Sequence, residues 1–150
     1  LFKVDNQISF GELLIAVAEK MSPYPDRQEM IREDILRREH ISSQIFAEFG
    51  FALLHCRTGG VIRPAFSVCL TKDLGPFVHE YLKGIRTVFI MLVPVDDNVK
   101  INNDIMGHVS SMLIEDYAFM DVVAGGNKEE VRDLLSRNLK KYFNQYIARL

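Results

Sequence analysis

The sequence predicts an α/β (α+β) fold in which a small mixed β-sheet carries helices on both faces. Three observations indicate it. Apolar residues recur at helical spacing before residue 41 and after residue 100, whereas the segments between them have the short apolar or alternating runs of strands. The segment 87–93 is apolar throughout, as expected of a strand covered on both sides. The resulting order is α, α, β, β, β, α, α, α, which places helices before and after the sheet.

The first helix is expected to begin with a capping box formed by Ser9 and Glu12. It should end at 22–25, where two prolines restrict the backbone and remove N–H donors. Its apolar face consists of Phe10, Leu13, Leu14, Val17, Ala18 and Met21.

A second helix is expected from Asp26, which with Glu29 resembles a start signal. Its last turn holds Arg37 and Arg38, whose positive charge suits a helix C-terminus. Its apolar side consists of Met30, Ile31, Ile35 and Leu36.

The central segments predict strands. The run 51–56 reads as a buried strand, Gly59-Gly60 as a turn, and 61–70 as a second strand. Pro64 indicates either an edge strand or the beginning of that strand. Alternation places Phe66, Val68 and Leu70 on one face and Ala65, Ser67 and Cys69 on the other.

Three helices are expected after a loop at 94–100. The short middle helix, 117–123, should end at Gly125-Gly126, and Asn127 with Glu130 should open the last one. The inner faces are Ile105, Val109, Met112 and Leu113 in the first of these helices and Val131, Leu134, Leu135, Leu139, Tyr142 and Phe143 in the last.

Composition limits the function classes. With 150 residues, 48% hydrophobic and 25% charged, residues 1–150 should form one globular domain. The net charge of −2 argues against direct nucleic-acid binding, and no apolar run approaches the ~20 residues that span a bilayer. Cys56 and Cys69 are expected to be the reduced thiols of a cytoplasmic protein. Because the sequence does not begin with methionine, we expect it to be a piece of a longer protein.

Four histidines are candidates for chemistry. His40, His79 and His108 read as surface or boundary residues. His55 differs because it lies near the end of an apolar strand, where α/β folds place their sites. Arg57 follows two residues later on the same strand face, so imidazole and guanidinium could converge on one anion. This pair suits a phosphoryl-accepting histidine, which needs a neutral ring nitrogen and a cation.

Competing chemistries are weaker. Cys56 and His55 are adjacent on one strand and point to opposite faces, so they cannot form a nucleophilic pair. The chain has neither CxxC nor HExxH spacing and lacks a glycine-rich phosphate loop before a lysine. We therefore expect neither a metal nor a cofactor.

Residues 35–42 (ILRREHIS) and 51–57 (FALLHCR) resemble the enzyme IIA domain of the fructose–mannitol class in the bacterial phosphoenolpyruvate-dependent sugar phosphotransferase system (PTS). Segments 88–94 and 127–135 continue the resemblance, which covers roughly 9–139. It implies a helix-flanked mixed sheet without metal or nucleotide. It also implies that His55 accepts phosphate from the phosphocarrier protein HPr and that Arg38 lies beside this histidine.

The sequence departs from transport-type domains, which usually have proline before the active histidine and glycine after it. Here those positions hold Leu54 and Cys56, Asn102 replaces a second histidine in the loop before the next helix, and Phe46–Phe49 replaces a Gly-Asn-Gly-like stretch. The version with Leu-Leu-His-Cys-Arg resembles the domains fused to the C-terminus of transcription regulators of the mannitol-operon-activator and BglG-like antiterminator class. This resemblance implies that residues 1–150 are the C-terminal part of a larger protein.

Three functions follow from this resemblance. The first is a regulatory phosphoacceptor module whose phosphorylation changes docking with neighbouring regulation domains. The second is a sugar-specific phosphotransferase component that passes phosphate to a IIB domain. The third is a degenerate IIA-like domain that only mediates protein contacts.

Overall fold

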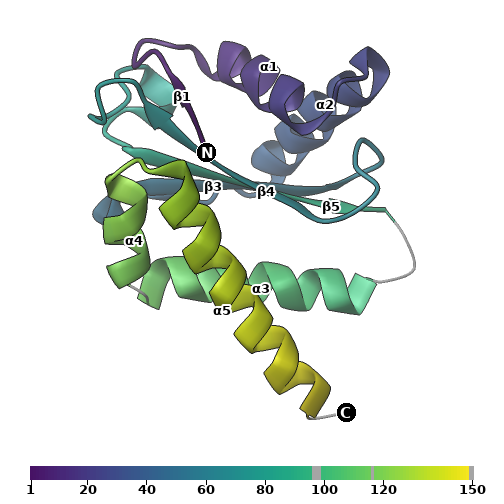
Figure 1. Cartoon of the computed structure of the whole chain (residues 1–150). Coiled ribbons are helices and arrows are strands. Elements are labelled where there is room, and N and C mark those ends of the chain that lie inside the picture. Colours follow the sequence, from purple (N-terminus) through teal and green to yellow (C-terminus); the bar gives the residue numbers. More distant parts are fainter. Residues whose placement is uncertain (96–98, 116, 149–150) are drawn as a thin grey trace.

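The computed structural model describes residues 1–95, 99–115 and 117–148, which form a five-stranded mixed sheet between two helical layers (Figure 1). The strand order is β1-β4-β5-β3-β2. β5 is parallel to β3 and antiparallel to β4. The strands are β1 (Phe2–Val4), β2 (Ile45–Phe46), β3 (Phe51–Thr58), β4 (Ala65–Thr71) and β5 (Thr87–Pro94). The helices are α1 (Phe10–Met21), α2 (Pro25–Ile41), α3 (Val99–Glu115), α4 (Tyr117–Ala124) and α5 (Lys128–Ala148), with 3-10 turns η1 (Ala47–Phe49) and η2 (Glu80–Leu82).

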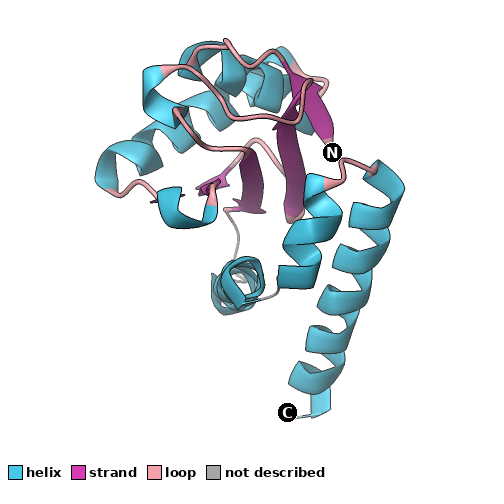
Figure 2. Ribbon diagram, turned by 90° about the vertical axis from the view of Figure 1, so that its left-hand side faces the viewer, coloured by secondary structure: helices cyan, strands magenta, loops and turns pink. Residues whose placement is uncertain are grey.

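The helices lie on both faces of the sheet, which confirms the predicted fold class. α1 and α2 cover one face, and α3, α4 and α5 cover the other (Figures 1 and 2). Side-chain alternation divides the core accordingly. Leu54, Cys56 and Cys69 pack in the α1–α2 layer, whereas Leu53 and Val68 pack in the α3–α5 layer.

β5 occupies the centre of the sheet and is buried along its whole length. Its Val88, Ile90 and Leu92 face the α1–α2 layer, and its Phe89 and Met91 face the other. This agrees with the prediction from its continuous apolar sequence, because a strand covered on both faces has no polar side.

Local signals at three helix ends are confirmed. Ser9 and Glu12 form a reciprocal capping box at α1, and α1 ends at Met21 as predicted. The Asn127 side chain accepts hydrogen bonds of 3.1 Å from the backbone N–H groups of Glu129 and Glu130, so it caps α5.

The predicted start of the second helix was wrong. α2 begins at Pro25, with Tyr24 at the N-cap and no side-chain cap, because proline at the first helical position needs no hydrogen-bond acceptor. Asp26 is therefore already inside the helix. Pro64 lies immediately before β4, so of the two alternatives it marks the strand's beginning.

Two short strands, β1 and β2, are absent from the predicted order. β1 has three residues and β2 has two, which is too short for a periodic pattern. Both extend the edges of a sheet nucleated elsewhere: β1 pairs in parallel with the end of β4, and β2 pairs only with Phe51 and Ala52 of β3. The side chains of Ile105, Leu139, Tyr142 and Phe143 lie outside the described residues.

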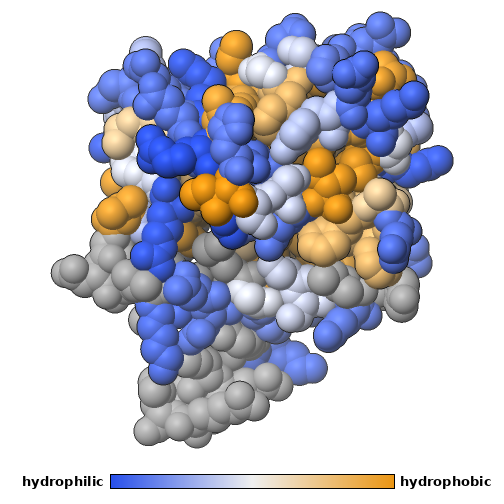
Figure 3. All heavy atoms as spheres, turned by 180° about the vertical axis from the view of Figure 1, so that it is seen from behind, coloured by the Kyte–Doolittle hydropathy of each residue, from blue (hydrophilic) through white to orange (hydrophobic). Residues whose placement is uncertain are grey.

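The molecular surface mixes polar and apolar side chains. Ile41, Ile62 and Val95 are the most exposed of the described large apolar residues, at 69–72%. Figure 3 shows apolar atoms interspersed with hydrophilic ones on the face seen from behind. None of the helices in the described ranges is both long and apolar enough to cross a membrane.

Gly60 closes the turn after β3 against α2, and we expect Gly60→Ala to destabilise the fold. A Cβ atom at this position would lie 2.5 Å from Ile31 Cγ1 and 2.8 Å from the backbone oxygen of Arg27. Because a helix backbone cannot easily yield, the cost should be about 1–3 kcal/mol in the free energy of unfolding. Chemical denaturation measures it. Gly107→Ala is the matched control, since that Cβ meets nothing within 4 Å. It should stabilise α3 by up to about 1 kcal/mol, and equal effects of the two substitutions would contradict the expectation.

Candidate functional site

β3 carries the two candidate residues on one face. Because side chains alternate along a strand, His55 and Arg57 share the face of Phe51 and Leu53, which pack in the α3–α5 layer. His55 lies opposite Met91 in the parallel pairing of β3 with β5. The site is thus near the carboxyl ends of two parallel strands, where open α/β sheets commonly bind ligands.

His55 is almost completely buried, with 6% of its surface exposed. Its Nδ1 atom is inaccessible and has no hydrogen-bond partner, and within the described ranges it is the sole buried side-chain nitrogen or oxygen in that condition. An unpartnered buried polar atom costs about 1–3 kcal/mol, so folds retain one only where something offsets that cost. This atom therefore marks His55 as a functional candidate.

The electrostatic surroundings hold the imidazole neutral. Burial lowers the pKa of His55 below its ordinary value of 6.5, and the positive charge of Arg38 lowers this pKa further. The backbone carbonyl of Leu53 opposes both effects in part. A neutral imidazole has a free lone pair, which is the state that a nucleophile needs.

Arg38 belongs to the opposite helical layer, and its charge acts on the pKa of the His55 ring. It is half-buried near the end of α2, a helix that packs against β3. Its neighbour Glu39 is buried and accepts a hydrogen bond of 2.5 Å from the Tyr81 hydroxyl. This bond ties the end of α2 to η2 and so fixes the turn that carries Arg38.

Arg57 is exposed and turns toward α3. Its Nη2 donates a hydrogen bond of 3.0 Å to Oδ1 of Asn103. Of the two arginines, only Arg38 contributes to the lowered pKa of His55. In this structure Arg57 bridges β3 to α3, and the convergence of its guanidinium with the His55 ring on one anion stays a prediction.

The remaining candidates lie where the sequence suggested. His40 and His79 are exposed, and His108 is at the boundary of the core. Cys56 is in the core, where burial and the nearby charge of Asp34 raise the pKa of its thiol to about 12. Such a thiol is protonated at neutral pH and is a poor nucleophile.

Sequence reasoning missed Asn103 and the Glu39–Tyr81 bond. Asn103 belongs to the first turns of α3, and Asn102 lies in the same helix rather than in the preceding loop, with its side chain outside the described residues. Glu39 stands in a run of charged residues, yet only 9% of its surface is exposed. The available signal for a structural role of Glu39 was its position as a single acidic residue between Arg38 and His40.

Replacing Arg38 with glutamine should raise the pKa of His55 toward 6.5. The pKa should rise because the guanidinium charge disfavours a second positive charge on the ring, whereas a neutral amide does not. An NMR titration of the His55 ring protons measures the change. Arg37→Gln is the matched control, since Arg37 pairs with Asp34 at 3.0 Å. Equal shifts in both variants, or a fall in pKa, would show that Arg38 does not act on the ring.

Comparisons with known proteins show which family and which fold the chain shares. The family "Phosphoenolpyruvate-dependent sugar phosphotransferase system, EIIA 2" matches residues 6–138. The "Putative transcriptional regulator MtlR" of Streptococcus mutans is 23% identical over 136 residues, which are 90% of this chain and 21% of that protein. The chain therefore spans about a fifth of the length of this relative. Among solved structures, the nitrogen regulatory protein IIA-Ntr from Neisseria meningitidis has a TM-score of 0.57 at 17% identity, covering 82% of this chain and 81% of that one, which shows a shared fold.

Proposed function

The chain belongs to the EIIA type 2 family of the phosphoenolpyruvate-dependent sugar phosphotransferase system, and we propose that it is a regulatory domain that accepts phosphate from phospho-HPr on His55. The observation that carries the proposal is the neutral, buried His55 ring, whose Nδ1 atom lacks a partner and whose pKa is lowered by burial and by Arg38. Proteins concentrate such perturbed groups at functional sites.

The burial of the ring selects the attacking atom. Nδ1 is inaccessible, so a phosphoryl donor can approach only Nε2. Nδ1 then carries the proton, and the Nε2 lone pair attacks phosphorus in line with the P–N bond of the donor phosphohistidine. That bond breaks as the new P–N bond forms. The histidine of HPr leaves as a neutral imidazole when its other ring nitrogen already carries a proton, and the Nδ1 proton of His55 is lost afterwards to solvent.

Arg38 has the charge that the product needs. A phosphoryl group adds a charge of about −1.5 to −2, which a nearby guanidinium offsets through charge-assisted hydrogen bonds. Arg57 is close by on the same strand face and could leave Asn103 to join it. In the unphosphorylated domain burial, assisted by Arg38, lowers the pKa of the His55 ring, and in the phosphorylated domain Arg38 would stabilise the added charge.

The regulatory assignment rests on the kind of relative that the chain resembles. The similar protein is described as a transcriptional regulator, and this chain corresponds to about a fifth of its length. In the proposed function, the charge on His55 alters the docking of neighbouring regulation domains in the cytoplasm. A coupling of about 1–3 kcal/mol would change the regulated activity about 5–150-fold.

The direct test is labelling with phosphoenolpyruvate, enzyme I and HPr, with the phosphoryl group carrying the label. We expect the domain to be labelled only when all three are present. A domain that stays unlabelled under conditions in which HPr is phosphorylated would contradict phosphoacceptance and favour a role in protein contacts alone.

A second candidate function is phosphoryl transfer onward to a IIB domain, which the family assignment itself favours. Adding IIB domains to the purified, labelled protein separates the two functions. Retention of the label agrees with regulation. Rapid transfer of the label to a IIB domain would replace the regulatory proposal with a transport role.

A further inference from the structure

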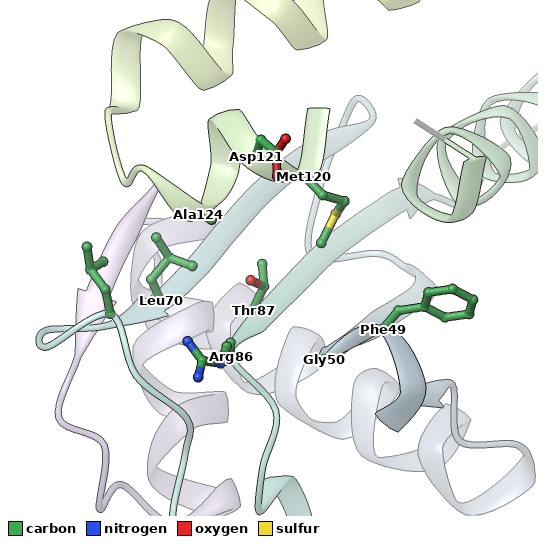
Figure 4. A pocket seen from close by; sticks show the side chains of 9 residues that line it. Phe49, Gly50, Leu70, Arg86, Thr87, Met120, Asp121 and Ala124 are labelled. Atoms are coloured by element: carbon green, nitrogen blue, oxygen red, sulfur yellow. The ribbon is translucent and has the colours of Figure 1, made fainter. Parts of the chain in front are cut away.

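A cavity lies at the opposite end of the sheet from His55 and the carboxyl ends of β3 and β5. Its volume is about 270 Å³, and it is lined by residues from β5 and the position before it, from the end of β4 and the turn after it, from the turn before β3, and from α4 (Figure 4). Arg86 immediately precedes β5 and Thr87 begins it, whereas His55 lies opposite Met91, four residues beyond Thr87. At about 3.3 Å per residue the two sites are about 13 Å apart along the strand.

Two opposite charges line this cavity without pairing with each other. Arg86 lies at one side of the cavity and Asp121 of α4 at the other (Figure 4). Both are exposed, and within the described part of the chain neither side chain forms an ion pair or a hydrogen bond. Because these two side chains line one cavity and do not pair with each other, each remains available to an opposite charge on a bound molecule.

Besides the two charged residues and Thr87, the cavity is lined by apolar side chains and Gly50. The large apolar side chains of the lining are those of Leu70, Leu74, Met120 and Phe49. Figure 4 shows the Met120 side chain extending from α4 toward Thr87. Leu74 has a φ of +60°, which is unusual for a branched side chain, and Asp73 holds its turn by accepting hydrogen bonds from Thr71 Oγ1 and the Gly75 N–H. The backbone thus maintains a conformation that keeps an apolar side chain on the cavity wall.

From these features we infer that the cavity binds a free α-amino acid with an apolar side chain. Arg86, assisted by the Thr87 hydroxyl, would hold the carboxylate, and Asp121 would hold the ammonium group. The leucine and methionine side chains would contact the ligand's side chain. The volume is below the ~300–1,000 Å³ of pockets for drug-sized molecules, which suits a ligand no larger than one amino acid.

Calorimetric and NMR titrations with individual amino acids test this inference without using phosphorylation. At least one apolar amino acid should bind and shift the amide signals of Thr87 and Met120. Arg86→Gln and Asp121→Asn should each weaken binding at least about tenfold, because each removes one charge-assisted contact. Lys83→Gln, a charge change at an exposed residue outside the cavity lining, should leave the affinity unchanged.

Ligand analogues give a test that does not depend on the folding of variants. The des-amino acid and the amino-acid amide each lack one of the two charges, so each should bind at least about tenfold more weakly than the parent amino acid. Absence of binding by every amino acid would overturn the inference. Equal binding by an analogue, or unchanged binding after both substitutions, would also overturn it. The phosphoacceptor role of His55 would stand in each of these cases.

Discussion

Replacing His55 with glutamine is expected to abolish the transfer of phosphate from phospho-HPr to this domain. The loss should exceed ~1,000-fold in rate, since removing an attacking nucleophile leaves no group to form the new bond. Glutamine keeps a polar side chain of similar length at this buried position but has no lone pair of comparable nucleophilicity. Time-resolved labelling of the variant and the natural sequence measures the effect.

Two controls distinguish this loss from unfolding. His40→Gln and His79→Gln change exposed histidines by the same chemistry and should label at the natural rate. His55→Leu should lose labelling while remaining folded, because leucine removes the unpartnered Nδ1 atom from an apolar face. We expect that variant to be at least as stable as the natural sequence, by up to about 1 kcal/mol. Labelling of either His55 variant at the natural rate would exclude this histidine as the acceptor.

The largest loss of stability is expected from Phe89→Ala. Phe89 is fully buried in β5, and its ring contacts those of Phe51, Phe66 and Phe119 at centroid distances of 5.7, 6.0 and 6.2 Å. Truncation removes apolar contacts from both the sheet and α4 and leaves a cavity that the rigid strands cannot close. The cost should be about 3–5 kcal/mol, a large part of the ~5–15 kcal/mol that stabilises an ordinary domain.

Chemical denaturation of Phe89→Ala should be compared with that of Phe49→Ala. The Phe49 ring is 45% exposed and lies 6.3 Å from Phe51, so its truncation should cost less than about 1 kcal/mol. A similar cost for the two variants would contradict the assignment of Phe89 to the centre of the core.

Most of the fold was predictable because its main signals are local. The capping box at Ser9 depends on residues three apart, and the continuous apolar run of β5 reports burial on both faces directly. The edge strands β1 and β2 were not predictable, because so few residues have no period and form only against an existing strand. The start of α2 was misjudged because Pro25 needs no capping side chain.

The candidate site was predictable only in part. The position of His55 near a strand end could be read from its own segment, and strand alternation placed Arg57 on the same face. The effect of Arg38 on the pKa of His55 depends on how α2 packs on β3, so the pairing of these two residues came from the family resemblance and not from spacing. The contact between Arg57 and Asn103 joins residues 46 positions apart, and no local pattern predicts such a pair.

The most direct measurement is the identification of the phosphorylated atom in the natural domain after labelling through HPr. Mass spectrometry of the digested protein locates the residue, and ³¹P NMR of the intact protein distinguishes the two ring nitrogens. We expect a single phosphoryl group on Nε2 of His55, because Nδ1 is inaccessible. Phosphate on any other residue, or on Nδ1 of this ring, would contradict the proposed site.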